Sequence, residues 1–205
     1  MRWVVVWFTL IVLLATPSIL STNASPHGVG NAANEGCQCH AFSADTMILV
    51  EGLPQRFESK MTLNLTLSLE SSIPMSEGQH NGGFRLEYIG EGSVVPLNHT
   101  LTQELDGYLT HTENGSFLRE WTFEWTTPLD NSTVVEFRIY GNAVNGNNEP
   151  TGDGWSELTI KVPGVQSNED FSLNTSQDID LIDIAILVLG LLLLGYLLWS
   201  SFRSN

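Results

Sequence analysis

Apolar and polar residues alternate with a period of two through most of residues 46–164. Such alternation is typical of strands that bury one face and expose the other. Turn-forming clusters rich in Gly, Asn, Asp, Ser and Pro separate these segments. The pattern predicts an all-β fold, an antiparallel β-sandwich of short strands. The strands are expected around Met47–Val50, Met61–Leu69, Phe84–Tyr88, Tyr108–Thr112, Trp121–Trp125, Val135–Ile139 and Leu158–Val162.

The two longest apolar stretches lie near the ends of the chain. Trp3–Ala15 follows the basic residue Arg2 and precedes small residues at 21–25, which is typical of a cleaved secretory signal. Leu181–Trp199 is almost wholly apolar and is long enough to cross a bilayer as a helix. Arg203, the one basic residue beyond it, favours a cytoplasmic C-terminus.

These stretches divide the chain into an exported domain and a membrane anchor. We predict a single-pass protein of the cell membrane with an extracellular ectodomain. The C-terminal helix is expected to hold the protein in the membrane. The predicted parts are a signal peptide (1–24), an exported segment with a Cys-x-Cys-His run (25–45), the β-sandwich (46–164), an acidic stalk (165–180), a transmembrane helix (181–199) and a cytoplasmic tail (200–205).

The charge of the chain excludes one class of partner. The formal net charge is −15, from 8 Lys plus Arg against 23 Asp plus Glu. Such an acidic surface disfavours binding of nucleic acid and of anionic lipid headgroups. Asn-x-Ser/Thr sequons predict a glycoprotein, and a protein or glycan ligand at the cell surface is the expected partner. The sequons lie at Asn23, Asn64, Asn98, Asn114, Asn131 and Asn174.

Several motifs in the ectodomain resemble a known family. Gly82–Leu86, Tyr108–Thr112, Trp121–Pro128 and the run Gly141–Asn147 with the later Gly152-Asp153 are similar, in this order, to the Reeler-like domains of prokaryotic surface proteins. These are often called choice-of-anchor domains, because their C-terminal anchors vary. The resemblance implies an extracellular β-sandwich and implies no catalytic activity.

The run Cys37-Gln38-Cys39-His40 is the main candidate site, and it holds both cysteines of the chain. The resemblance implies a Cys-x-x-Cys-His run here, which would attach haem c, but this chain has one intervening residue fewer. Four interpretations stay open: a strained and redox-active disulfide, haem c with His40 on the iron, a copper or zinc site, and an intermolecular disulfide or lipid attachment.

A metal at this run needs further ligands. His111 is the best candidate, because it lies in the family-like Tyr-Leu-Thr-His-Thr string. The alternative is a strand histidine whose ring is satisfied by neighbouring backbone. Glu149 and Asp153 lie in a loop rich in Asn and Gly, which favours tight turns over a calcium site.

The sequence shows none of the nucleophile, phosphate-binding or metalloprotease motifs searched for, so we expect a protein without catalysis. The leading prediction is a membrane-anchored surface protein that acts as a binding module. The alternative is a haem c or metal protein of electron transfer or metal handling that uses Cys37, Cys39 and His40.

Overall fold

The computed structural model describes residues 25–34, 36–37, 39–175 and 181–203, and the side chains of the C-terminal helix at 185–196 and 199. The predicted signal peptide, the sequon at Asn23 and the stalk residues 176–180 lie outside the described residues.

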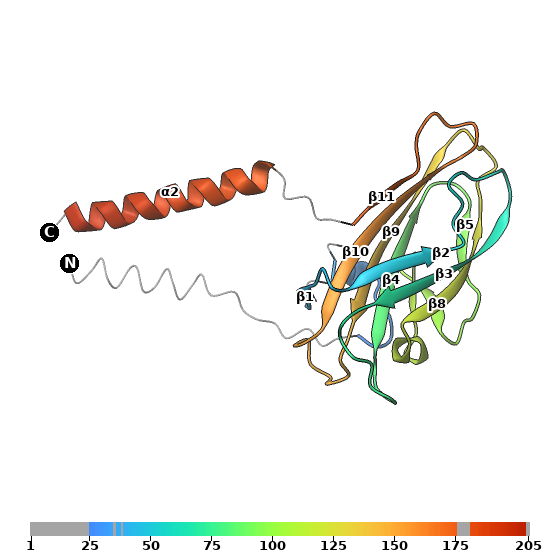
Figure 1. Ribbon diagram of the computed structural model, residues 1–205, viewed down its shortest axis with the longest axis horizontal. Coiled ribbons are helices and arrows are strands. Elements are labelled where there is room, and N and C mark those ends of the chain that lie inside the picture. Colours follow the sequence, from blue (N-terminus) through green and yellow to red (C-terminus); the bar gives the residue numbers. More distant parts are fainter. Residues whose placement is uncertain (1–24, 35, 38, 176–180, 204–205) are drawn as a thin grey trace.

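Two β-sheets pack face to face, which confirms the predicted all-β sandwich (Figure 1). The smaller sheet has the order β2-β3-β8-β5, and the larger has the order β1-β10-β9-β4-β7-β6 with β11 paired to β10. The strands of the smaller sheet are β2 (Met47–Glu51), β3 (Thr62–Glu70), β5 (Ser93–Pro96) and β8 (Glu120–Thr126). Those of the larger sheet are β1 (Ala41–Phe42), β4 (Gly82–Ile89), β6 (Thr102–Leu105), β7 (Tyr108–His111), β9 (Val134–Ala143), β10 (Gly154–Pro163) and β11 (Ser172–Asn174).

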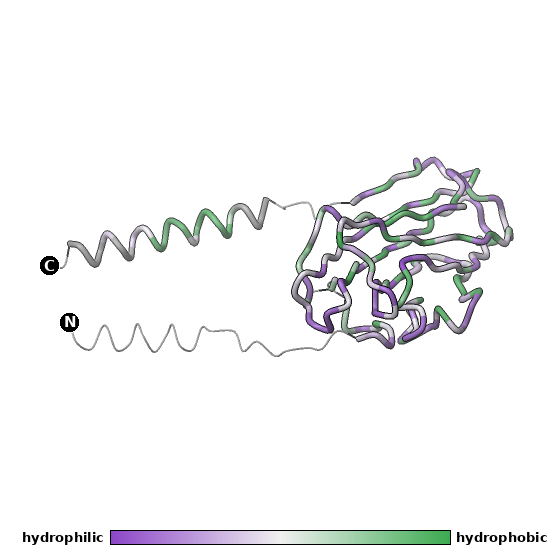
Figure 2. The backbone as a smooth tube through the Cα atoms, turned by 60° about the horizontal axis from the view of Figure 1, so that its bottom comes forward, coloured by the Kyte–Doolittle hydropathy of each residue, from purple (hydrophilic) through white to green (hydrophobic). Residues whose placement is uncertain are grey.

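The core forms where the apolar faces of the two sheets meet. Alternate residues of the central strands point inward, as the period of two predicts. The resulting green and purple alternation along the strands is visible in Figure 2. Trp121, Phe123 and Trp125 are at most 1 % exposed, so the aromatic residues of β8 are core residues. Leu65, Leu67, Leu86, Phe137, Ile139, Ile160 and Val162 complete the centre of this core.

The strand pairing departs from the sequence prediction in two places. β1 pairs with β10 in parallel, whereas every other strand pair is antiparallel. The segment predicted as a structureless stalk contains β11, which pairs with β10 through Leu173 opposite Ile160. Arg56 holds this segment by donating to the backbone carbonyls of Gly164, Ser167 and Glu169.

Two 3₁₀ helices and one α-helix complete the described residues. They are η1 (Asn31–Ala33), η2 (Asn114–Phe117) and α2 (Leu181–Arg203), and the predicted transmembrane helix 181–199 falls within α2. Among the residues that the structure describes, there is no helix long and apolar enough to cross a membrane.

The structure places most sequons on exposed positions. Asn64, Asn98, Asn114 and Asn174 are exposed, whereas Asn131 is partly buried. Asn64 lies on the outer, polar face of β3, opposite Glu124 of β8. Glycosylation at these positions stays a prediction.

Candidate functional site

Residues 25–34, 36–37 and 39–40, which we call the N-terminal strap, cross the outer face of the larger sheet. The strap backbone binds the sheet at Val29, whose N–H donates to Thr110 Oγ1 at 3.1 Å. Trp155 of β10 donates from Nε1 to the carbonyl of His40 at 3.1 Å. Gly36 lies directly on the Trp155 ring, where an added Cβ would come within 2.5 Å of Cη2, and its φ of +90° also favours glycine. The strap therefore packs directly against the larger sheet and is held there by hydrogen bonds.

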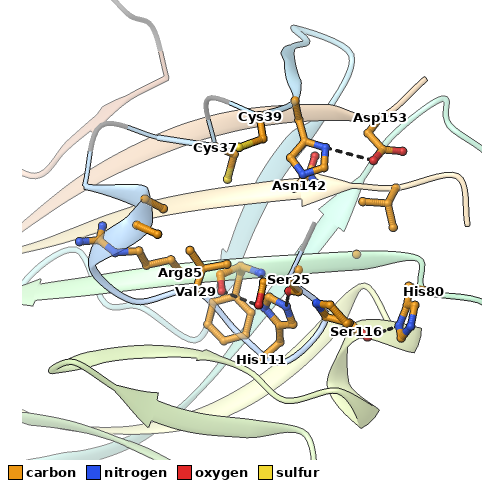
Figure 3. A pocket seen from close by; sticks show the side chains of 18 of the residues that line it. Ser25, Val29, Cys37, Cys39, His80, Arg85, His111, Ser116, Asn142 and Asp153 are labelled. Carbon is orange, nitrogen blue, oxygen red and sulfur yellow. Dashed lines mark hydrogen bonds and ion pairs between the residues drawn. The ribbon is translucent and has the colours of Figure 1, made fainter. Parts of the chain in front are cut away.

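A cavity of about 380 Å³ lies between the strap and the larger sheet (Figure 3). This volume falls in the lower part of the range of small-molecule sites, about 300–1,000 Å³. All four residues that the sequence singles out, Cys37, Cys39, His40 and His111, line this one cavity. The structure thus brings the predicted residues to one place, together with Arg85 of β4.

His40 is paired with a carboxylate that is distant in the sequence. Its Nδ1 lies 3.1 Å from Oδ2 of Asp153, and the two side chains are only 9 % and 3 % exposed. The two atoms lie within ion-pair distance, but they are not aligned as a hydrogen bond, and Nδ1 has no other hydrogen-bond partner. Burial lowers the pKa of His40, and the charge of Asp153 opposes this in part. His40 is consequently neutral at neutral pH.

The two cysteines differ in their surroundings. Cys37 is partly buried and is a free thiol, whereas Cys39 is exposed. Burial, followed by the charge of Cys39, raises the pKa of Cys37 to about 12, and the charge of Arg85 lowers it only in part. The Cys37 sulfur is therefore a protonated thiol at neutral pH, which is a poor nucleophile and a poor metal ligand.

His111 is held by backbone, as the alternative interpretation of this residue anticipates. Its side chain is buried, and Phe84 N–H donates to Nδ1 at 3.1 Å. The other ring nitrogen, Nε2, lies 3.4 Å from the carbonyl of Ser25, which it can reach as a donor. Burial lowers the pKa of His111, and the carbonyls of Phe84 and Ser25, which can accept from the ring nitrogens, oppose this. Both ring nitrogens therefore have partners within the fold.

The predicted copper or zinc ligands are not arranged as a metal site. Within the described part of the chain, no three His, Cys, Asp or Glu side chains are grouped so that they could hold a metal ion. Cys37, Cys39, His40 and His111 share the cavity, but the ring of His111 is engaged by Phe84 and Ser25.

Sequence reasoning missed the most unusual residue of the cavity. Arg85 lies on the outer face of β4, where the period of two predicts a solvated side chain, yet it is only 2 % exposed. Its guanidinium stacks 3.6 Å from the centre of the Tyr108 ring and 5.6 Å from that of Tyr140. Nη2 donates to Asn34 Oδ1 at 2.6 Å, but Nε and Nη1 have no partner.

Two further polar residues of the cavity were also missed. Asn142 of β9 is 8 % exposed, and its Oδ1 has no hydrogen-bond partner. Ser116 of η2 lies with its Oγ 2.5 Å from Nδ1 of His80. No local sequence signal marks these residues, because the strap that buries them is distant in the chain.

Comparison with solved structures finds chains to which this one is similar. No protein-family model matches the chain, and no curated protein does. The chain is similar to a reeler domain fragment of human F-spondin with 14 % identity and a TM-score of 0.38, over 61 % of this chain and 95 % of that one. A second human fragment has 13 % identity and a TM-score of 0.36, over 67 % and 92 %. The Reelin-N domain of F-spondin has 14 % identity and a TM-score of 0.36, over 68 % and 90 %. These similarities concern the fold and name no ligand.

Proposed function

We propose that this protein is an exported, membrane-anchored surface protein whose β-sandwich binds a small ligand in the cavity under the N-terminal strap. The observation that carries this proposal is the cavity itself. It lies against a regular sheet, and it gathers buried polar side chains whose hydrogen-bonding groups are unsatisfied. Polar groups of this kind are costly in a fold unless a partner completes them.

Binding without catalysis fits the chemistry of the lining residues. Among the described residues of the lining, the candidate nucleophile pair is Ser116 with His80. The Ser116 hydroxyl donates to the carbonyl of Glu113 at 2.6 Å, so His80 does not receive its proton. Cys37, whose pKa is raised to about 12, is likewise not activated.

The ligand-binding proposal is tested by filling the cavity. Thermal unfolding of the full chain in detergent is screened against small polar molecules, because a ligand that binds only the folded state raises Tm. Val144→Trp places a large side chain on the lining of the cavity, where Val144 is partly buried. Leu129→Trp is the matched control, because Leu129 is 65 % exposed and is not on this lining. Ligands should stabilise the unaltered protein and Leu129→Trp but not Val144→Trp. Equal stabilisation of all three proteins would overturn the proposal.

Membrane attachment is supported by the apolar stretch 181–199. The described side chains of α2 within it include Ile186, Leu189 and Leu192, each 64–65 % exposed, which form an apolar surface that lipid would cover. We propose a cytoplasmic C-terminus and an extracellular sandwich. The test is protease treatment of intact cells: it should remove the sandwich and leave a membrane-bound C-terminal fragment. Release of the protein by alkaline carbonate would contradict the anchor.

The pair of His40 and Asp153 favours a second candidate function, haem c or metal binding at the Cys37-Cys39-His40 run. Asp153 Oδ2 lies 3.1 Å from His40 Nδ1, although not aligned as a hydrogen bond, and a carboxylate beside Nδ1 is common around metal-ligating histidines. The described residues do not fit a preformed metal site, because no three ligand side chains are grouped. The test is an absorption spectrum with metal analysis of protein made in a host that attaches haem. Colourless protein without stoichiometric iron, copper or zinc would exclude this function, whereas a cofactor lost in His40→Ala would support it.

A further inference from the structure

Arg85 differs from the other arginines whose side chains the structure describes. Arg138 lies 3.2 Å from Glu87 and 2.8 Å from Glu136. Arg56 lies 3.6 Å from Asp170, and Arg119 donates to three backbone carbonyls. Arg85 is the most buried of the four. Like Arg119, it has no carboxylate within ion-pair distance among the described residues, but unlike Arg119 it keeps two nitrogens, Nε and Nη1, without a partner.

The burial of an unpaired guanidinium needs a physical reason. A buried cation without an anion is strongly unfavourable, and a guanidinium does not lose its proton to escape the cost. Stacking on Tyr108 and Tyr140 and the bond to Asn34 fix the orientation of the group. Neither contact brings a negative charge, and Nε and Nη1 keep unused N–H groups. Among the residues that the structure describes, none supplies the anion that this cation lacks.

The carboxylates of the cavity lining do not fill this role. Asp153 accepts from the N–H of Asn145 at 3.0 Å and lies 3.1 Å from His40 Nδ1, and no ion pair joins Asp153 or Glu149 to Arg85. In Figure 3, Arg85 and Asp153 lie at opposite ends of the cavity, with the cysteines between them. The described part of the chain therefore leaves the anion of Arg85 to a ligand.

Asn142 indicates what else this ligand carries. Arg85 is opposite Tyr140 in the pairing of β4 with β9, so Asn142 stands diagonally across from it. The Cα atoms of diagonal residues in such a strand pair lie about 7–8 Å apart. The unused Oδ1 of Asn142 accepts hydrogen bonds and therefore suits an O–H or N–H donor. The lining of the cavity also has apolar side chains, those of Val29, Ala33 and Phe84.

We propose that the cavity binds a small organic acid whose carboxylate pairs with Arg85 and whose hydroxyl or amino group, a few atoms away, donates to Asn142. This inference rests on the proposed ligand-binding function and names the class of ligand. A guanidinium is well suited to a carboxylate, and a charge-assisted contact in a buried site is stronger than a neutral one.

The test uses three probes and isothermal titration of the full chain in detergent. The probes are 4-hydroxybutyrate, its amide 4-hydroxybutyramide, and butyrate, which lacks the donor. The acid should bind the unaltered protein about 10- to 100-fold more tightly than the amide, as expected for one hydrogen-bonded charged group. Butyrate should bind more weakly than the hydroxy acid, because Asn142 then stays unpaired.

Two variants with equal change of net charge locate the effect. Arg85→Gln removes the buried cation, and Arg138→Gln removes a cation paired with Glu87 and Glu136. Affinity for 4-hydroxybutyrate should fall about 10- to 100-fold in Arg85→Gln and change less than about 2-fold in Arg138→Gln. Equal losses in the two variants would overturn the assignment to Arg85.

The outcomes separate this inference from the function on which it rests. Equal affinity for the acid and the amide, with both lost in Val144→Trp, keeps the binding cavity and overturns the organic-acid inference. Absence of binding by all three probes at millimolar concentration also overturns it, while the wider screen still tests the cavity. If Arg85→Gln does not fold, the comparison of acid with amide on the unaltered protein decides alone.

Discussion

Replacing each of two buried arginines by Met separates a residue kept for the fold from one kept for binding. Arg119 and Arg85 are 8 % and 2 % exposed, so Met fills a similar buried volume at each position. Arg119 donates to the carbonyls of Asn81, Ile73 and Val144 at 2.8, 2.8 and 3.2 Å. Arg85 makes one hydrogen bond, to Asn34.

The expected costs follow from these contacts. At about 1.5 kcal/mol for each hydrogen bond from a charged group, Arg119→Met should lower the free energy of unfolding by about 4 kcal/mol. Arg85→Met loses one such bond and a cation–π contact, together about 3 kcal/mol. It also removes an uncompensated buried charge, and such replacements are often neutral or stabilising by about 1–4 kcal/mol. Arg85→Met should therefore lie within about 1 kcal/mol of the unaltered protein.

The assay is thermal unfolding of the full chain in detergent, followed by tryptophan fluorescence, to which the core residues Trp121 and Trp125 contribute. The Tm should fall by roughly 8–16 °C in Arg119→Met and shift by less than about 4 °C in Arg85→Met. A loss in Arg85→Met as large as that in Arg119→Met would show that Arg85 is a structural residue. The argument for a buried cation that waits for a ligand would then fail.

Three further predictions concern the lining of the cavity. With iodoacetamide at pH 8, peptide mass spectrometry should find Cys39 modified well before Cys37, because burial raises the pKa of Cys37 to about 12; equal rates would contradict this. Gly83→Ala should cost about 1–3 kcal/mol in urea unfolding, because its Cβ would lie 2.6 Å from Cε1 of His111; unchanged stability would refute the contact. His111 has a pKa that is lowered in the fold, so its unfolded form binds a proton first as pH falls. Stability should therefore be complete above about pH 6.5 and fall below it by up to about 1.4 kcal/mol per pH unit, and this slope should be shallower in His111→Gln.

The alternation of apolar and polar residues in the sequence was sufficient to predict the central strands. β3 and β8 alternate along their length, and β9 and β10 alternate over part of theirs. Burying the apolar side chains of these strands leaves one arrangement of each strand against the core. β5, β6 and β11 were missed, because they are short and their hydrogen bonds come from neighbours distant in the chain. The parallel pairing of β1 with β10 has no local signal for the same reason.

The candidate site was predicted only in part. Cys37, Cys39, His40 and His111 do line one cavity, so their chemistry pointed to the right region. Their roles depend on contacts that no spacing encodes, such as the approach of Asp153 to His40. Arg85 was missed, because alternation along β4 places it on the wet face, and only the strap makes that face buried.

The central claim, that the cavity holds an acid at Arg85, is tested most directly by NMR of the arginine side chains. Titration of ¹⁵N-labelled full chain with 4-hydroxybutyrate follows the Nε–H signals of Arg85 and Arg119 in the same sample. The account predicts a saturable downfield shift and slower solvent exchange at Arg85, because its Nε–H has no partner in the fold. The Arg119 signal should stay in place, since its Nε already donates to the carbonyl of Asn81. An Arg85 signal that does not move while the acid binds would contradict the account.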